Sequence, residues 1–432
     1  MTAASIDIVT RPAARTRLHS DTAERLLHAT LFLTILLSPF VFIEPSPYEF
    51  MMVPLALASI VAGVSIPRLI APLFLLLMLW NIGGMLSLFN VHWKSDAVMF
   101  VATSIYMAGS AVLFACIVSE NSVRRLDVLR TAYVIAALIA ATIGIAAYFN
   151  LFPGAEQLTM GGRAKSTFKD PNVYAPFLVL PLLLLVEVTL REGIRLKNIA
   201  AASVLVMALL LAFSRGAWAN AAASAAVLMG MMFIAARAPR LRGRILFLSL
   251  LSVAGIAALI VLLVSFESIG GLFKERAALI QYYDAGEAGR FGNQIRSISM
   301  LLERPNGFGP LEFGVIFPQA PHNVYLNAFS AYGWLGGVTY ILLVLTSLAI
   351  GFRHALVATP WQHYFIAIYA AFVGVVLEGA IVDTDHWRHF FLLLGAVWGL
   401  SAATLAHLRA ARWRAANGVG SPGGHLVVSR IG

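Results

Sequence analysis

The sequence predicts an all-α membrane protein that crosses the bilayer many times. Of its 432 residues, 59% are hydrophobic and only 12% are charged, whereas a soluble domain of this length carries roughly twice that charged share. Apolar runs of about 18 to 25 residues recur from end to end, and each is long enough to cross a bilayer as a helix. Because these runs are continuous rather than alternating, a β-barrel is excluded.

We place about twelve spans along the chain, from the length of its apolar runs. They cover residues 26–43, 48–65, 69–89, 97–119, 131–150, 172–190, 197–213, 216–236, 245–265, 323–351, 362–382 and 389–407. No internal repeat relates these spans, so the inverted-repeat pattern of many transporters is not visible.

The basic residues predict which connections are cytoplasmic. One alternate set is short and dense in Arg and Lys, at residues 124–130, 191–197 and 237–244, and such loops stay on the cytoplasmic side. Both tails belong to this set, as an even number of spans requires. The net charge of +10 is therefore explained by topology and by contact with anionic membrane lipids, and nucleic acid is not an expected partner.

This topology divides the chain into five segments. Residues 1–25 form a cytoplasmic tail, 26–265 hold the first nine spans, 266–321 form a long outer loop, 322–407 hold the last three spans, and 408–432 form a second cytoplasmic tail. The long loop is expected to be structured, since Asn293–Glu303 has helical periodicity and the glycine- and proline-rich residues 305–310 predict a turn after it.

His322 is the strongest candidate for chemistry, because it stands with Asn323 at the outer start of a span. An imidazole near its ordinary pKa can accept a proton at neutral pH, so a general base, or a group that orients an acceptor hydroxyl, is expected. Asn323 can hold a sugar hydroxyl or the imidazole, and Tyr325 offers an aromatic face to a sugar. The alternative is an interfacial histidine with a structural role.

Two glycines, Gly333 and Gly336, lie farther along the same span and predict tight helix contact behind the site. Near another span start, Asp170 precedes Pro171 and is expected to cap a helix.

Three arginines are expected on the same outer face. Arg215 lies in a very short connection, and a planar guanidinium that never deprotonates suits a fixed cation for phosphate or pyrophosphate. Arg163 and Arg290 each stand beside glycines and have the same character. The alternatives are a snorkelling anchor for Arg215 and solvated loop charges for the other two.

A second outer group contains Asp383, Asp385, His386 and Arg388. These residues either form an ion-pair network that fixes the loop or bind sugar hydroxyls, and the sequence leaves both readings open. Since no ligand spacing typical of a metal and no nucleotide-binding loop is present, neither a metal nor a cofactor is expected.

Together these pieces resemble the O-antigen ligase and O-antigen polymerase superfamily. His322-Asn323 followed, after nine residues, by Gly333-Trp334-Leu335-Gly336 looks like its signature. The segments Ser214-Arg215-Gly216 and Thr167–Asn172 agree with it, as does Arg290 ahead of the 305–309 turn. The resemblance covers most of the chain, from the first span to the last.

The resemblance implies a metal-independent, inverting glycosyltransferase with a GT-C-like fold in the bacterial inner membrane. Its donor would be a glycan on undecaprenyl pyrophosphate, and its acceptor would be lipid A–core for a ligase or a nascent glycan for a polymerase. The 266–321 loop and the active site would be periplasmic, with both termini cytoplasmic. Arg215 and Arg290 match arginines that hold the pyrophosphate, and His322 matches the residue that activates or positions the acceptor hydroxyl; Arg163 has no such match.

Two other functions remain open from the residues alone. A transporter or flippase would place ionisable residues near the bilayer midplane, whereas Glu187 and Glu378 lie near span ends. The polar Asn81 and Asn220 lie within spans, so transport remains an alternative. A non-catalytic scaffold would not need a histidine and several arginines on one face. Between ligase and polymerase the sequence does not choose, because it names no acceptor.

Overall fold

The computed structural model describes residues 14–92, 94–265, 270, 271, 273, 286, 289–317 and 319–417. These residues are almost all helical, with a single two-stranded hairpin of β1 (Thr159–Met160) and β2 (Arg163–Ala164). Eight of the described helices are long and apolar enough to cross a membrane, and three shorter helices are also apolar. The prediction of an all-α membrane protein is confirmed, while the exact number of spans and the GT-C-like topology stay predictions.

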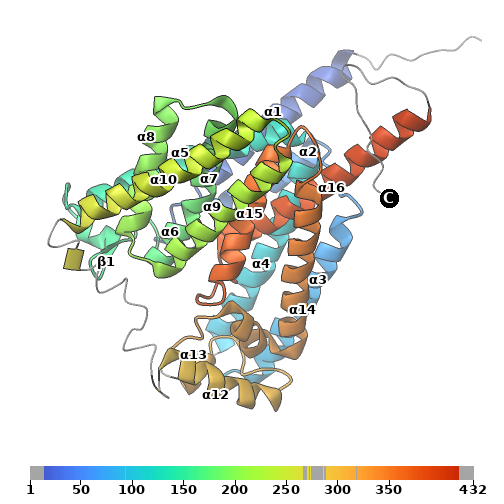
Figure 1. The fold of residues 1–432 in the computed structure, drawn as a ribbon. Helices are drawn as coiled ribbons and strands as arrows, with labels where there is room; N and C mark the ends of the chain where they lie inside the picture. The colour runs from blue at the N-terminus through green and yellow to red at the C-terminus, as the bar shows by residue number, and fades with distance from the viewer. Residues whose placement is uncertain are drawn as a thin grey trace, which may run out of the picture.

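The helices follow one another with few long connections (Figure 1). In chain order they are α1 (Ala14–Leu36), α2 (Pro47–Val61), α3 (Ile70–Ser87), η1 (Leu88–Asn90), α4 (Lys94–Ser119), α5 (Ser122–Tyr148), η2 (Ala155–Leu158), α6 (Pro171–Phe177), α7 (Val179–Glu192), α8 (Leu196–Leu211), α9 (Arg215–Ala235), α10 (Pro239–Val264), α12 (Arg290–Leu302), α13 (Phe313–Ile316), α14 (Val324–Ala355), α15 (Gln362–Glu378) and α16 (Arg388–Ala416).

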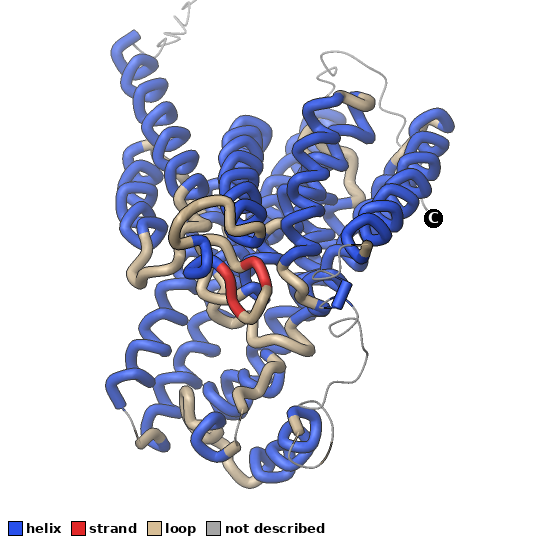
Figure 2. The backbone as a smooth tube through the Cα atoms, turned by 90° about the vertical axis from the view of Figure 1, so that its left-hand side faces the viewer, coloured by secondary structure: helices blue, strands red, loops and turns tan. Residues whose placement is uncertain are grey.

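The bundle has two distinct ends. Helices α12 and α13 lie at one end, whereas α1 begins and α16 finishes at the other (Figure 1). Seen from the side, the β1–β2 hairpin lies among loops on one flank of the bundle (Figure 2). Which of these two ends faces the cytoplasm stays a prediction of the charge pattern.

Three helix pairs approach closely because one partner carries a glycine at the contact. A Cβ atom on Gly83 of α3 would lie 2.5 Å from the carbonyl oxygen of Tyr332 in α14. A Cβ on Gly395 of α16 would lie 2.3 Å from the carbonyl of Ala111 in α4, and one on Gly374 of α15 would lie 2.0 Å from Oδ1 of Asn220 in α9. Small residues let backbones meet inside a membrane, where packing rather than the hydrophobic effect holds helices together.

Several predicted span boundaries differ from the structure, and two of these differences have a clear physical cause. Helix α5 begins at Ser122 rather than near residue 131, because the buried Arg125 has partners inside the protein: its guanidinium binds Glu24 (3.1 Å) and the carbonyl of Ile117 (2.8 Å). A buried charge is tolerated when it is paired in this way. Helix α1 ends at Leu36 instead of continuing to residue 43, since Pro39 disfavours helix in the residues just before it.

The helix predicted at residues 293–303 is confirmed as α12, which begins slightly earlier at Arg290. Asn293, Ser297 and Leu301 form its buried face. Leu301 joins a small apolar cluster with Phe308, Phe313 and Phe317, so the described end of the long loop has a core of its own.

Candidate functional site

His322 and Asn323 form the turn from which α14 starts. The side chain of Asn323 caps the helix, with Oδ1 accepting hydrogen bonds from the backbone N–H groups of Tyr325 (3.1 Å) and Leu326 (3.1 Å). His322 precedes the cap in the left-handed backbone region, with φ +46°, and is exposed. The candidate base therefore sits on an ordered helix entrance rather than on a loose loop.

A carboxylate from another part of the chain holds this turn. Asp383 Oδ2 accepts a hydrogen bond from the backbone N–H of His322 (3.0 Å), and Oδ1 accepts one from that of Asn323 (2.9 Å). The N–H of Val324 donates to the carbonyl of Gly379 (2.8 Å). Three successive N–H groups are thus bound by the segment that follows α15, which fixes the unusual backbone conformation of His322.

The protonation state of Asp383 decides how well it holds the turn. Burial, and after it the charge of the neighbouring Asp385, raise the pKa of Asp383 to about 7 overall, although the two backbone N–H groups oppose the shift. Only the ionised carboxylate accepts through both oxygens, because a protonated carboxyl turns one oxygen into a donor. The two hydrogen bonds that Asp383 accepts from the backbone of His322 and Asn323 are therefore strongest above pH 7, and they weaken as the pH falls through that value.

Replacing Asp383 with Asn is expected to lower kcat by about tenfold to a hundredfold, because one charge-assisted hydrogen bond worth roughly 1.5 to 3 kcal/mol is lost. The amide keeps one accepting oxygen but presents an NH2 group to the second N–H. Since His322 itself remains, KM is expected to change little, and the fall in rate below pH 7 caused by Asp383 protonation should disappear. An unchanged kcat in the variant would contradict this role.

Asp385 is the centre of a buried polar network. Its Oδ2 accepts hydrogen bonds from Asn327 Nδ2 (3.1 Å) and the Tyr332 hydroxyl (3.4 Å), and lies 3.3 Å from Nδ1 of His386. Burial lowers the pKa of His386, but the charge of Asp385 and its hydrogen bond outweigh this, so the pKa is raised overall. The loop-fixing network that the sequence left open is present, and sugar binding by Asp383 or Asp385 stays a prediction.

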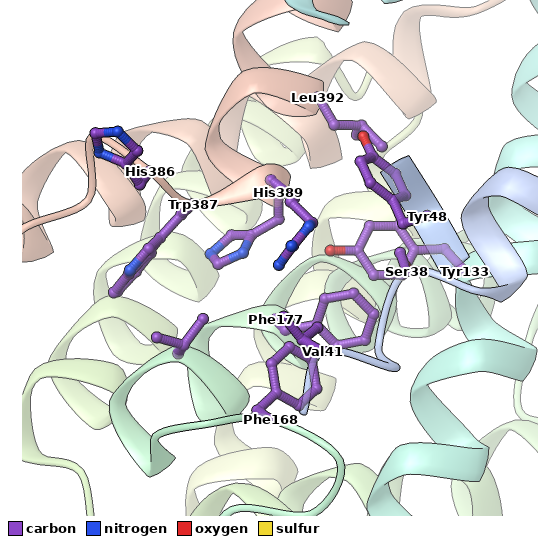
Figure 3. Close-up of a pocket in the computed structure, with 12 residues that line it drawn as sticks. Ser38, Val41, Tyr48, Tyr133, Phe168, Phe177, His386, Trp387, His389 and Leu392 are labelled. Carbon is purple, nitrogen blue, oxygen red and sulfur yellow. The ribbon is translucent and has the colours of Figure 1, made fainter. Parts of the chain in front are cut away.

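Arg388, at the end of the same loop, contacts protein side chains rather than the Asp385 network. It forms an ion pair with Glu49 of α2 (2.5 Å). Next to it lies a cavity lined by residues from four parts of the chain, among them the rings of Tyr48, Tyr133, Phe177 and His389 (Figure 3). Arg388 thus anchors the loop to α2.

Gly333 creates a break inside α14 rather than the helix contact expected from the sequence. Its φ is +66° and its ψ −172°, a combination that is essentially restricted to glycine. The 305–309 turn fills the break: the N–H of Trp334 donates to Pro305 (2.8 Å), and that of Phe308 donates to Ser330 (2.9 Å). Gly336 does make the expected contact, since it abuts Gly83 of α3.

Arg215 is the first residue of α9 and is half-buried. The preceding Ser214 caps the helix. Gly216 faces the end of α15, where an added Cβ would lie 3.0 Å from Glu378 Oε1 and 3.2 Å from Ile381. Because the chain runs on from Ile381 to Asp383, the same short segment lies against the start of α9 and binds the His322 turn.

Glu378 fixes the relation between these two helices. It is 2% exposed, and its Oε2 accepts a hydrogen bond from Asn220 Nδ2 of α9 (2.7 Å). Asn220 Oδ1 in turn accepts from the hydroxyl of Ser224 (3.0 Å). This polar contact, together with the close approach at Gly374, sets the position of Arg215 at the head of α9.

Arg163 binds the chain three residues before Arg215. Its Nε donates to the carbonyl of Ala212 (2.9 Å) and its terminal nitrogen donates to Oδ1 of Asn172 (2.7 Å). Asp170 caps the helix that contains Asn172, as the sequence predicted. These bonds brace the chain just ahead of Arg215, and direct substrate binding by Arg163 stays a prediction.

Arg290 is the first residue of α12, and its guanidinium carbon lies 4.8 Å from the centre of the Phe291 ring. One turn later, Gln294 Nε2 donates to the carbonyl of Pro321 (2.8 Å), the residue before His322. Residues four apart share one face of a helix, so Arg290 lies on the face that contacts the His322 turn.

Tyr325 differs from the rest of the predicted set because it is turned inward. Its hydroxyl donates to the carbonyl of Val376 (2.6 Å), and its ring centre is 6.0 Å from that of Tyr340. The structure therefore does not place this ring on the outer surface as a platform for a sugar.

The structure brings His322, Asn323 and Asp383 into direct contact and ties Arg215 and Arg290 to the same region through neighbouring residues. Sequence reasoning missed Asp383 as the partner of two backbone groups and Gln294 as the link between α12 and the turn. Only Gln294 had a signal, since it stands four residues after Arg290. Within the part of the chain that the structure describes, no group of three or more His, Cys, Asp or Glu residues is arranged to hold a metal ion.

Residues 200–341 match the protein family described as O-Antigen ligase. The matched range contains Arg215, Arg290 and His322, together with the Gly333 break. No curated protein matches the chain.

Proposed function

We propose that this chain, a member of the O-antigen ligase and polymerase superfamily by its match over residues 200–341, transfers a glycan from undecaprenyl pyrophosphate to a sugar hydroxyl at the periplasmic face of the inner membrane. The observation that carries the proposal is the His322 turn, held by Asp383 on the segment that also lies against the start of α9 at Gly216. An ordered base near a fixed cation is what this reaction requires.

The two arginines suit the departure of the pyrophosphate. Arg215 and Arg290 are each the first residue of a helix, α9 and α12. A helix N-terminus carries a partial positive charge, which adds to that of the guanidinium. As the bond between the anomeric carbon and the pyrophosphate oxygen breaks, the electron pair leaves with that oxygen, and preorganised cations stabilise its growing charge without metal chemistry.

His322 would act on the acceptor. The acceptor hydroxyl oxygen attacks the anomeric carbon as the pyrophosphate leaves, and the hydroxyl proton passes to the imidazole. A single displacement of this kind inverts the anomeric configuration. Asp383 does not touch the reacting atoms in this scheme, since it acts through the backbone of His322 as a positioning residue.

The positions of the buried acids support transfer over transport. Glu187 lies near the end of α7 and pairs with Arg191 (2.5 Å), while Glu378 is the last residue of α15. An ion-coupled transporter would use ionisable groups near the bilayer midplane. Both of these buried glutamates lie toward helix ends instead. Their positions therefore favour transfer over transport, as the family match does.

The test of this proposal is transfer by the purified chain in proteoliposomes that contain an undecaprenyl-pyrophosphate glycan. With lipid A–core as acceptor, glycan-modified lipid A–core would establish a ligase. With further donor as acceptor, a ladder of lengthening lipid-linked chains would establish a polymerase. If wild-type protein forms neither product, the proposal fails.

Arg215→Ala and Arg290→Ala provide the matched variants in the same assay. Each is expected to reduce kcat by about a hundredfold to a thousandfold, the cost of removing one electrostatic contact to the charge that develops in the transition state. Arg412→Ala, a change in the last turns of α16, serves as the control and should leave transfer unchanged. Wild-type rates in both site variants would remove the arginines from the reaction.

A further inference from the structure

A groove at the far end of the bundle plays no part in the proposed transfer. It has a volume of about 420 Å³ and is formed by the turn of Gly193 and Ile194 after α7 and by the first turns of α10. Helix α10 begins at the end of the bundle where α1 also begins, away from α12 and the His322 turn (Figure 1). The groove therefore lies where the chain would meet the opposite surface of the bilayer.

Two glycines keep this groove open. A Cβ atom on Gly193 or on Gly243 would meet no heavy atom within 4 Å. The walls are apolar, since Ile194 is 60% exposed and Phe247 is 61% exposed. The apolar surface continues along α10, whose most hydrophobic stretch is only 11% buried within the protein. A hydrocarbon chain lying against Phe247 would thus remain in contact with the lipid-facing side of the helix.

Arg244 provides the polar end of the groove. One terminal nitrogen donates to the carbonyls of Leu190 (3.2 Å) and Arg191 (3.4 Å), which caps the end of α7 and fixes the guanidinium in place. Its Nε and second terminal nitrogen have no hydrogen-bond partner among the described residues. A guanidinium that is fixed in place and still has N–H donors available binds phosphate oxygens well.

Two further cations stand three residues from the groove lining in the chain, Arg240 before Gly243 and Lys197 after Ile194. Arg240 and Lys197 are both exposed, and neither forms an ion pair with any residue in the described part of the chain. A basic rim above apolar walls is complementary to a lipid with an anionic head group.

We propose that this groove binds an anionic phospholipid. Its phosphate would accept hydrogen bonds from Arg244, and an acyl chain would lie along Ile194 and Phe247. The proposal does not depend on the transfer reaction, because none of these residues belongs to the site at the other end of the bundle.

Gly243→Leu tests the proposal by filling the groove. The position is helical, an added Cβ there meets no heavy atom within 4 Å, and leucine improves helix propensity, so the variant should fold. Gly255→Leu, at another open position of the same helix, is the matched control. The full chain would be purified in detergent, and its binding of phosphatidylglycerol and phosphatidylcholine compared by native mass spectrometry.

Wild-type protein and Gly255→Leu are expected to bind phosphatidylglycerol about fivefold more tightly than phosphatidylcholine, the effect of roughly one cation near a lipid phosphate. Gly243→Leu should lose this preference, and Arg244→Gln should lose it without closing the groove. Equal binding of the two lipids by the wild type, or an undiminished preference in Gly243→Leu, would overturn the proposal.

Discussion

Replacing His322 with Asn is expected to reduce glycan transfer by about two to four orders of magnitude, the usual contribution of a general base. Asn is the substitution of choice because His322 has a φ of +46°, and asparagine adopts that left-handed conformation more readily than alanine does. The backbone N–H that binds Asp383 is kept. The loss would therefore report on the imidazole and not on the turn.

The measurement is kcat and KM for transfer by purified wild-type and variant protein at equal amounts of folded chain. His407→Asn, a change near the far end of α16, is the matched control and should behave as wild type. Because His322 acts on the acceptor hydroxyl in this account, kcat should fall while donor binding is retained. A variant that keeps half of the wild-type kcat would exclude His322 as the base.

Replacing Gly333 with Ala is expected to destabilise the protein by about 3 kcal/mol, because the backbone conformation is one that alanine rarely adopts. The added methyl group would also lie 2.7 Å from the carbonyl oxygen of Pro305. That carbonyl accepts the N–H of Trp334 (2.8 Å) and anchors the 305–309 turn in the break of α14. Both effects act on the same contact.

Thermal unfolding in detergent measures this change, with a midpoint several degrees below that of the wild type. Gly109→Ala in α4 is the control, since an added Cβ there meets nothing within 4 Å and alanine favours helix. The Gly333 variant should also lose transfer, because the turn connects α12 and Arg290 to α14. Equal midpoints for the two variants would show that the break does not require glycine.

Local features of this fold were predictable because they depend on neighbouring residues. The cap at Asp170, the α12 helix and the turn after it all follow from short-range patterns of hydrogen bonding and periodicity. The cap at Asn323 was not predicted, although asparagine is a common N-cap residue. The candidate base His322 and Arg215 were proposed from their positions at the ends of apolar runs, and Arg290 from the glycines beside it; their roles stay predictions.

Contacts between distant segments were not predictable from these patterns. Asp383 binds the backbone of a residue 61 positions earlier, and Arg163 binds a carbonyl 49 positions later; nothing in the local sequence specifies either partner. The role of Gly333 was also mistaken, because a glycine that allows close helix packing and one that allows a helix break look the same in a sequence.

The extended start of α5 has a similar explanation. The positive-inside rule assigns Arg124, Arg125 and Arg130 to a loop, but it does not say whether the loop is helical. The ion pair between Arg125 and Glu24 depends on the packing of α5 against α1. Charge patterns thus assign the loop to a side of the membrane, which stays a prediction, and tertiary contacts decided the helix boundary.

The most direct test of the proposed transfer is the release of undecaprenyl pyrophosphate by the purified chain in the presence of a metal chelator. This account predicts one molecule released for each glycan joined to the acceptor by the wild type, and none above background with His322→Asn. It would be contradicted if the wild type released no undecaprenyl pyrophosphate while moving the intact lipid-linked glycan across the bilayer, since the protein would then be a transporter.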